Sequence, residues 1–170
     1  MFEKIDIYNM QLKTFDIIGN EWMLVTAGNL KEHNTMTASW GGLGILWHKP
    51  VATIYIRPQR YTKKFIDAEN FFTISFYNKQ YKKALEICGT ESGRDVNKDE
   101  KTGLTAKEFG NGIAFSQAYL VLVCEKLYAN PLNFDGILQK NILGTFYKDE
   151  DYHYVYIGGI VDAYENKNNR

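Results

Sequence analysis

The chain has 170 residues and a mass of 19.6 kDa, which is the size of one domain. Hydrophobic residues make up 45% and charged residues 24%, a balance typical of a folded globular chain and not of a disordered one. Lys plus Arg and Asp plus Glu are 20 each, so the overall basic excess of a nucleic-acid-binding domain is missing. The only cysteines, Cys88 and Cys124, exclude a disulfide framework and a cysteine-based zinc site.

Targeting signals are also missing from the sequence. No apolar run approaches the roughly 18 residues that a membrane span needs, and the charged N-terminal segment lacks the apolar core of a signal peptide. We therefore expect one domain over residues 1–170 in a reduced, cytoplasmic compartment, with no membrane and no nucleic-acid partner. Aromatic residues reach 15% and favour strands, so the composition favours a fold that is rich in β-structure.

Strand patterns dominate the chain from its N-terminal part onwards. Residues 14–18 and 21–27 flank Gly19-Asn20, which is the spacing of a two-residue hairpin. The Gly-rich stretch 41–44 and Lys49-Pro50 are predicted to separate two later strands. The further strands are predicted over residues 35–40, 51–57, 71–77, 113–127 and 152–164.

Few helices are predicted between these strands. One runs from Thr62, as its cap, to Asn70, and a second covers residues 79–88; short helical pieces are predicted over 104–109 and 138–143. A parallel βαβ array would need a helix between nearly every pair of strands. The order of elements therefore favours a mainly β fold, an antiparallel sheet that closes into a barrel with a few short helices.

Several common catalytic motifs are missing. The histidines at 33, 48 and 153 form no HExxH pattern, and the serines at 39 and 92 lack the Gly that a nucleophile elbow requires. The stretch from Gly42 to Trp47 begins like a dinucleotide fingerprint, but Trp47 stands where the third Gly would be. A Rossmann fold is therefore not expected to hold any nicotinamide cofactor.

A basic stretch marks the junction between a predicted strand and a predicted helix. Residues 57–64 contain Arg57, Arg60, Lys63 and Lys64 and no acid. Cations in the first turn of a helix oppose its dipole, which prefers anions there. The arrangement is favourable if a phosphate binds, because backbone N–H groups and guanidinium groups then meet one anion. The alternative is a solvated basic surface, and the residue pattern alone leaves both open.

Two further stretches have a suggestive pattern. Over residues 34–40, Thr35, Thr37 and Ser39 share one face of a predicted strand that ends in an aromatic residue, which suits the approach of a planar heterocycle. The alternative is an ordinary strand with one wet face. Residues 88–98 form a Gly-containing loop with Arg94 and Lys98, which by itself is typical of a surface loop.

Taken in chain order, three motifs closely resemble those of the flavin reductase-like, FMN-binding split-barrel family. They are Asn34-Thr-Met-Thr-Ala-Ser-Trp40, then Arg57-Pro-x-Arg60-Tyr-Thr62, then Cys88-Gly-x-x-Ser-Gly-Arg-Asp-x-x-Lys98. The nearest match within the family is the flavoredoxin-type branch, and the closing segment from His153 to Val161 resembles the family's final His and strand. The resemblance covers essentially the whole chain.

The resemblance implies a six-stranded antiparallel split β-barrel, a homodimer with FMN near the subunit interface, and electron transfer. It implies that residues 34–40 line the flavin, that Arg57, Arg60 and Thr62 bind the phosphate side, and that Lys98 lies near the ring. The resemblance further implies that His153 is the catalytic residue, near the face where a donor stacks. The cofactor-binding set implied is Asn34, Thr35, Met36, Thr37, Ala38, Ser39, Trp40, Arg57, Arg60, Tyr61, Thr62, Ser92, Arg94 and Lys98.

The activity expected from this reading is that of an FMN-dependent oxidoreductase. Its electrons would come from NADH, NADPH or a redox-protein partner, and would pass to flavin or to a partner protein. Two alternatives stay open, a small electron carrier with no direct NAD(P)H activity and a flavin-binding or storage protein with no turnover. No metal is expected, and Cys88 and Cys124 are expected to fill core positions.

Overall fold

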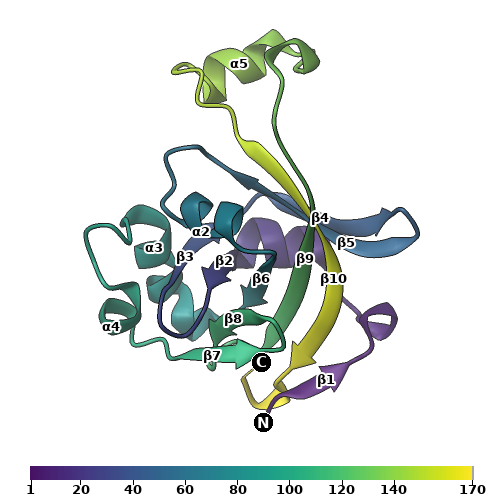
Figure 1. Ribbon diagram of the computed structural model, residues 1–170, viewed down its shortest axis with the longest axis vertical. Coiled ribbons are helices and arrows are strands. Elements are labelled where there is room, and N and C mark those ends of the chain that lie inside the picture. The colour runs from purple at the N-terminus through teal and green to yellow at the C-terminus, as the bar shows by residue number, and fades with distance from the viewer. Residues whose placement is uncertain (170) are drawn as a thin grey trace.

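The computed structural model describes residues 1–169 (Figure 1). Its strands are β1 (Glu3–Ile5), β2 (Met23–Gly28), β3 (His33–Ala38), β4 (Gly41–Leu46), β5 (Lys49–Ile56), β6 (Phe71–Phe76), β7 (Ala106–Phe109), β8 (Gly112–Phe115), β9 (Leu120–Pro131) and β10 (Tyr154–Glu165). The helices are short: α1 (Thr14–Asp16), α2 (Thr62–Ala68), α3 (Lys82–Thr90), α4 (Lys98–Thr102) and α5 (Lys140–Phe146).

Eight strands form one antiparallel sheet. Its order is β3-β2-β6-β9-β10-β5-β4, with β1 added beside β10, and β7 and β8 form a separate hairpin. Within residues 1–169, β3 and β4 are not paired with each other, so the sheet curls without closing. The predicted mainly β, antiparallel split-barrel fold is confirmed, with eight strands in its sheet in place of the six expected.

The central strands are buried on both faces. In β2, Leu24 packs into one hydrophobic cluster while its neighbour Val25 packs into the other, and Val121 and Leu122 of β9 divide in the same way. Helix α2 packs on β2 and β3, and α3 packs on the same two strands. Burial on both faces explains why these strands read as nearly continuous apolar runs without alternation.

The predicted hairpin at Gly19-Asn20 is wrong. Residues 14–16 are α1, and Ile17–Glu21 continue it as a π-helical turn that buries Ile17 and Ile18 side by side. The strand starts only at Met23, after Trp22, whose φ of 72° redirects the chain. Two adjacent isoleucines can be buried together on a helical turn, whereas a half-buried strand would turn one of them to solvent.

Other segments also differ from expectation. The Gly-rich stretch is strand β4, not a connection, and 104–109 contains strand β7 in place of a helix. The long run 113–127 is divided into β8 and β9. Thr62 is the first residue of α2 and Tyr61 its N-cap; the Thr62 hydroxyl accepts a hydrogen bond from Asn34 instead of capping the helix. The other predicted strands and the helices at 62–70, 79–88 and 138–143 are confirmed, with shifted ends.

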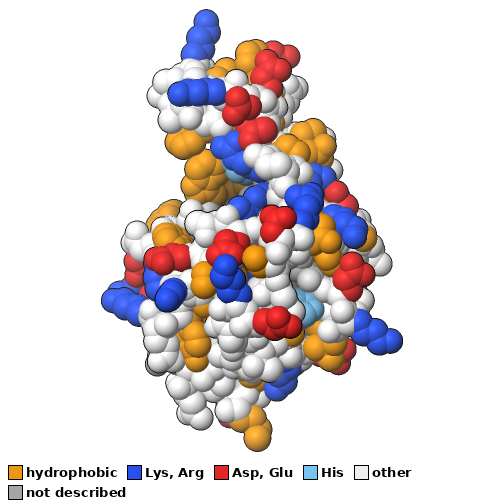
Figure 2. All heavy atoms as spheres, turned by 90° about the vertical axis from the view of Figure 1, so that its left-hand side faces the viewer, with side chains coloured by type: hydrophobic (Ala, Val, Ile, Leu, Met, Phe, Trp, Pro, Cys, Tyr) orange, Lys and Arg blue, Asp and Glu red, His pale blue; other side chains and the backbone are white. Residues whose placement is uncertain are grey.

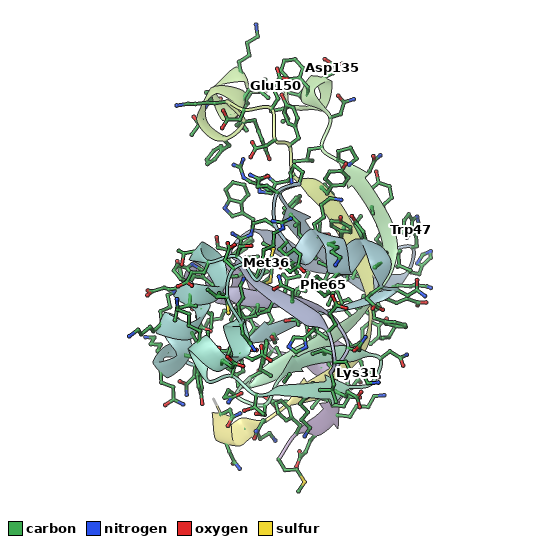
Figure 3. The ribbon with its side chains drawn as sticks, turned by 60° about the vertical axis from the view of Figure 1, so that its left-hand side comes forward. Lys31, Met36, Trp47, Phe65, Asp135 and Glu150 are labelled. Atoms are coloured by element: carbon green, nitrogen blue, oxygen red, sulfur yellow. The ribbon has the colours of Figure 1, made fainter. Side chains whose placement is uncertain are left out.

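Strands β9 and β10 extend beyond the body and carry residues 132–153, which we call the arm (Figure 1). The arm contains a 3-10 turn over Phe134–Gly136 and helix α5. Figure 3 shows Asp135 and Glu150 in the arm, well above the body that holds Lys31 and Phe65. The arm therefore stands apart from both hydrophobic clusters, although its base lies next to β3 and β5.

Gly158 of β10 occupies a position where no side chain fits. A Cβ atom there would lie 2.7 Å from Cys124 Cβ and 2.7 Å from Phe72 Cζ, both in the core. We expect Gly158→Ala to lower the free energy of unfolding by about 1–3 kcal/mol, because the crowded core must shift. Urea titration checks this against Gly42→Ala, whose Cβ meets nothing within 4 Å; equal stability of the two variants would contradict it.

Candidate functional site

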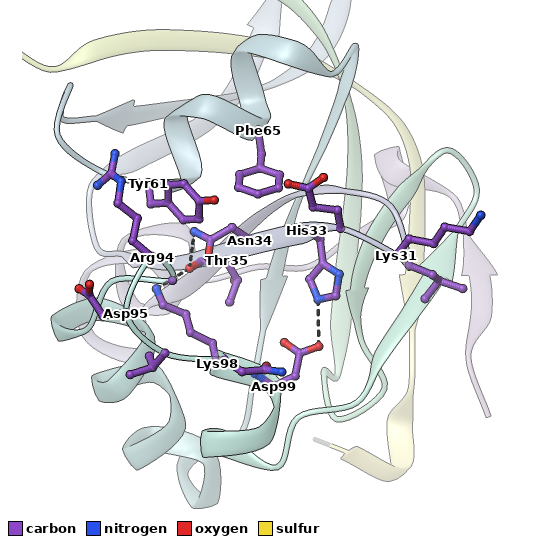
Figure 4. A pocket seen from close by; sticks show the side chains of 15 residues that line it. Lys31, His33, Asn34, Thr35, Tyr61, Phe65, Arg94, Asp95, Lys98 and Asp99 are labelled. Carbon is purple, nitrogen blue, oxygen red and sulfur yellow. Dashed lines mark hydrogen bonds and ion pairs between the residues drawn. The ribbon is translucent and has the colours of Figure 1, made fainter.

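Two neighbouring cavities lie at opposite ends of strand β3. The first has a volume of about 540 Å³ and lies between the β2–β3 connection, the start of α2 and the loop before α4 (Figure 4). Its lining includes five of the residues implied by the sequence: Asn34, Thr35, Tyr61, Arg94 and Lys98. Residues that are far apart in the sequence thus meet here at one end of β3.

The second cavity, of about 310 Å³, lies at the other end of β3, under the arm. Figure 2 shows the hollow between arm and body, with basic side chains and a histidine around it. Tyr55 and Phe146 line this cavity, and so do most of the remaining predicted residues. These are Met36, Thr37, Ala38, Ser39, Trp40, Arg57, Arg60 and His153. Thr62 and Ser92 line neither cavity.

Lys98 is a buried cation in the first cavity, with its side chain held by carbonyl groups. Its Nζ donates to the carbonyl oxygens of Thr35 at 2.7 Å and Cys88 at 2.9 Å, and the residue is only 6% exposed. Burial lowers the pKa of Lys98 to about 8, because neutral carbonyls do not repay the loss of water around the charge. Lys98 can therefore meet an anion in the cavity at neutral pH.

Asn34 connects β3 to the start of α2. Its Nδ2 donates to the buried Thr62 hydroxyl at 2.7 Å. Gly93 lies directly against this amide, since a Cβ on Gly93 would come within 1.9 Å of Asn34 Oδ1. Ser92 shapes the same loop, where its hydroxyl accepts a hydrogen bond from the Arg94 backbone N–H at 3.2 Å. Asn34 thus lies in the wall of the cavity, and Thr62 and Ser92, which do not line it, support the wall through these hydrogen bonds.

Arg60 and Arg94 bring two further cations. Arg60 Nη1 donates to the Gly89 carbonyl at 2.7 Å, and burial lowers the pKa of this guanidinium from its usual value. Arg94 lies over the Tyr61 ring, 4.8 Å from its centroid. Arg60 lines the second cavity and Arg94 the first, so positive charge stands on both sides of β3.

Arg57 has a different environment from Arg60. Its Nη1 forms an ion pair with Asp151 of the arm, and its Nη2 donates to the Phe146 carbonyl at 2.8 Å. The two arginines line the same cavity, as the sequence predicts, but Arg57 already has an acidic partner. Its predicted contact with a phosphate stays a prediction.

His153 is buried at the base of the arm. The Tyr147 hydroxyl lies 2.9 Å from its Nδ1, and its ring centroid is 5.0 Å from that of Trp40. Burial, together with the nearby charge of Arg57, lowers the pKa of His153 to about 4. The ring is therefore neutral at physiological pH and lies beside the exposed face of Trp40.

Sequence reasoning missed part of both cavities. His33 closes the far end of the first: its Nε2 lies 2.9 Å from Asp99 Oδ2 and its Nδ1 3.0 Å from the Asn29 carbonyl. Both ring nitrogens face oxygen atoms, and the hydrogen bond to the Asp99 carboxylate raises the pKa of His33. In the second cavity, Phe146 was missed because no motif surrounds this aromatic residue at the end of helix α5. Its short distance along the sequence from His153 was the one signal that could have indicated it.

Comparisons with known proteins give the family. The model of the flavin reductase like domain matches residues 16–170. The chain belongs to the flavin reductase-like family. No curated protein matches the sequence. Within the described residues, no helix is long and apolar enough to cross a membrane.

Solved structures of this family have the same fold at low sequence identity. An FMN-binding domain of a flavin reductases-like enzyme from Shewanella baltica superposes with a TM-score of 0.69 at 16% identity, over 97% of this chain and 77% of that one. Flavoredoxin from Methanosarcina acetivorans gives 0.67 at 20%, over 97% and 76%. An NADH:FAD oxidoreductase from Streptomyces globisporus gives 0.64 at 15%, over 88% and 78%.

Proposed function

We propose that this protein binds FMN across the two cavities and works as an oxidoreductase. It would accept electrons from NADH, NADPH or a redox-protein partner and pass them to flavin or to a partner protein. The observation that carries the proposal is the pair of shielded cations, Lys98 and Arg60, whose hydrogen bonds within residues 1–169 run only to backbone carbonyls, those of Thr35 in β3 and of Cys88 and Gly89 in α3. Family membership and the names of the similar structures support the choice of cofactor.

The residues present fit a phosphorylated flavin. Burying a cation is costly unless an anion compensates it, and a phosphate monoester brings roughly 1.5–2 negative charges. The cations form one cluster around β3, which suits FMN with its single phosphate better than FAD. Mass spectrometry of the cofactor released by heat decides between them, and FAD as the main species would overturn this assignment.

Bound FMN would supply the redox chemistry, since the flavin ring accepts a hydride or single electrons. The residues of this chain would bind the cofactor, orient its ring and polarise it. Lys98 offers a fixed positive charge that stabilises negative charge in the cavity. His153, neutral and held by Tyr147, offers an uncharged hydrogen-bonding ring beside Trp40 without repelling a cationic ligand.

The decisive experiment follows the colour of the purified protein. We expect a yellow protein whose absorbance near 450 nm bleaches under anaerobic conditions. Bleaching with NADH or NADPH supports a reductase, and bleaching only with a reduced redox protein supports a flavoredoxin-like carrier. A yellow protein that none of these donors bleaches supports the second candidate, a flavin-binding or storage protein. A colourless protein that takes up no FMN contradicts the proposal.

His153→Ala tests the role of the histidine at the base of the arm. We expect FMN to stay bound, because Lys98 and Arg60 are untouched, and the reduction rate to fall about tenfold or more, in the range of a lost positioning or proton-transfer group. Anaerobic stopped-flow absorbance measures the rate. Tyr147→Phe removes only the hydroxyl that meets His153 and should lower the rate less; unchanged rates with every donor leave His153 a structural role alone.

We also propose that the protein is a homodimer in a reduced, cytoplasmic compartment. Several large apolar side chains are more than half exposed, among them Ile45 at 65% and Trp47 at 59% on the β4–β5 hairpin, and symmetric pairing commonly covers such surfaces. The buried free thiols of Cys88 and Cys124 agree with a reduced compartment. Light scattering that gives a stable monomer with FMN bound would contradict the dimer.

A further inference from the structure

Two residues of the body hold the arm. Arg57 pairs with Asp151 and donates to the Phe146 carbonyl at 2.8 Å, and Gln59 Nε2 donates to the same Asp151 oxygen at 2.7 Å. Both come from the segment that follows β5. The arm is therefore fastened to the rim of the second cavity at both ends of the segment 146–151.

This contact is partly shielded from water. The side chains of Arg57 and Asp151 are only 28% and 19% exposed, and the Arg57 guanidinium also lies over the Tyr147 ring. A partly shielded, hydrogen-bonded ion pair is stronger than the exposed pairs on a protein surface. The pair also lowers the pKa of Asp151, so it stays formed at neutral pH.

Fastening the arm fixes an aromatic ring at the mouth of the cavity. The Phe146 ring meets Trp40 edge to face, with centroids 5.3 Å apart and an angle of 86° between the planes. Trp40 also lies against His153, with ring centroids 5.0 Å apart. Trp40 and Phe146 are still 42% and 43% exposed, so they stand at the entrance and not in the core. The width of the entrance thus depends on where the arm holds Phe146.

We propose that Arg57 is a positioning residue that keeps the arm closed as a gate over the second cavity, and that the closed gate slows large flat electron acceptors more than small ones on their way to the bound cofactor. The proposal rests on the proposed function, because the gated cavity is half of the site that we assign to FMN. It gives Arg57 a role other than contact with a phosphate. It also makes the arm, and not the barrel alone, a determinant of which electron donor or acceptor reacts.

The ion pair between Arg57 and Asp151, which we call the latch, is tested first, without any cofactor chemistry. Asp151→Asn removes the ion pair, and Asp149→Asn makes the same charge change in the arm at a residue that does not meet Arg57. We expect amide hydrogen exchange over residues 140–153 to become at least about fivefold faster in Asp151→Asn, and to stay unchanged in Asp149→Asn. Equal exchange in the two variants would overturn the latch.

The gate is tested by ring size in the FMN-loaded protein. The bound cofactor is reduced with dithionite, excess reductant is removed, and reoxidation is followed with 1,4-benzoquinone, which has one ring, or with 9,10-phenanthrenequinone, which has three. In each reaction two electrons and two protons pass from the reduced flavin to the quinone, which becomes the hydroquinone. No NAD(P)H is involved, so the test is independent of the natural donor.

Opening the gate should favour the larger quinone. We expect Asp151→Asn to speed reoxidation by phenanthrenequinone about tenfold and reoxidation by benzoquinone less than twofold. Phe146→Ala, which keeps the backbone carbonyl and the ion pair, should give the same change in the ratio with little change in hydrogen exchange. An unchanged ratio in both variants would overturn the gate. Failure of the proposed function is recognised separately, as a protein that binds no FMN while hydrogen exchange still reports on the latch.

Discussion

Replacing Arg60 by Ala should weaken FMN binding by roughly ten- to a hundredfold and leave riboflavin binding nearly unchanged. Arg60 is a shielded guanidinium at the wall of the second cavity that hydrogen-bonds to the Gly89 carbonyl and has spare donors. A hydrogen bond to a charged group contributes about 1.5–3 kcal/mol, which corresponds to this loss of affinity. Riboflavin has the same ring and ribityl chain but lacks the phosphate, so it cannot use the contact. Titration of the apoprotein with each ligand at one salt concentration measures the difference.

Lys64→Ala is the matched control for this experiment. Lys64 lies in the same basic stretch, but it is exposed and faces Glu32 at 3.8 Å, outside both cavities. We expect Lys64→Ala to leave the affinities for FMN and for riboflavin unchanged, apart from the small effect of a screened surface charge. Equal losses of FMN and riboflavin in Arg60→Ala would point to local unfolding. An equally small loss of FMN affinity in Arg60→Ala and in Lys64→Ala would mean that the basic stretch 57–64 is a solvated surface.

Much of the fold could be predicted because the burial pattern of the sheet is local in the sequence. The β-branched and aromatic runs around Ile74 and Leu122 identify strands whichever neighbours they have. Errors arose where tertiary burial overrides local pattern. Ile17 and Ile18 read as strand residues but are buried side by side on a helical turn. Residues 41–44 read as a connection between strands but belong to β4, which pairs with β5 at the edge of the sheet.

The candidate site could be predicted only as far as its motifs reach. Asn34, Arg60 and Lys98 stand in short patterns with charge or hydroxyl signals, and they do meet around β3. The partners of Arg57 could not be predicted, because Asp151 lies 94 residues away and belongs to no motif in the sequence. The spacing of Arg57 and Arg60 shows that they share a cavity wall, but not that one of them is already paired.

Lys98 should make FMN binding depend on pH above about 8. Its ammonium is the form that attracts an anion, and burial has lowered its pKa to about 8 in the protein without ligand. Binding a phosphate raises that pKa again, so FMN affinity should be constant from pH 7 to about 8 and then fall by up to about tenfold per pH unit. Titrations of FMN between pH 7 and 9.5 measure the decline.

Two comparisons separate this effect from alkaline unfolding. In the free protein the pKa of Lys98 is below its unfolded value of 10.5, so the unfolded state binds more protons between pH 8 and 10.5, and this group makes the fold more stable as pH rises. Loss of affinity over the same range therefore has the opposite sign to the stability change. Lys98→Met should bind FMN about ten- to a hundredfold more weakly at pH 7 and lose the pH dependence. Lys101→Met, on the same helix but paired with Glu91 near the surface, should retain both the affinity and the decline; a decline that persists in Lys98→Met would assign it to another group.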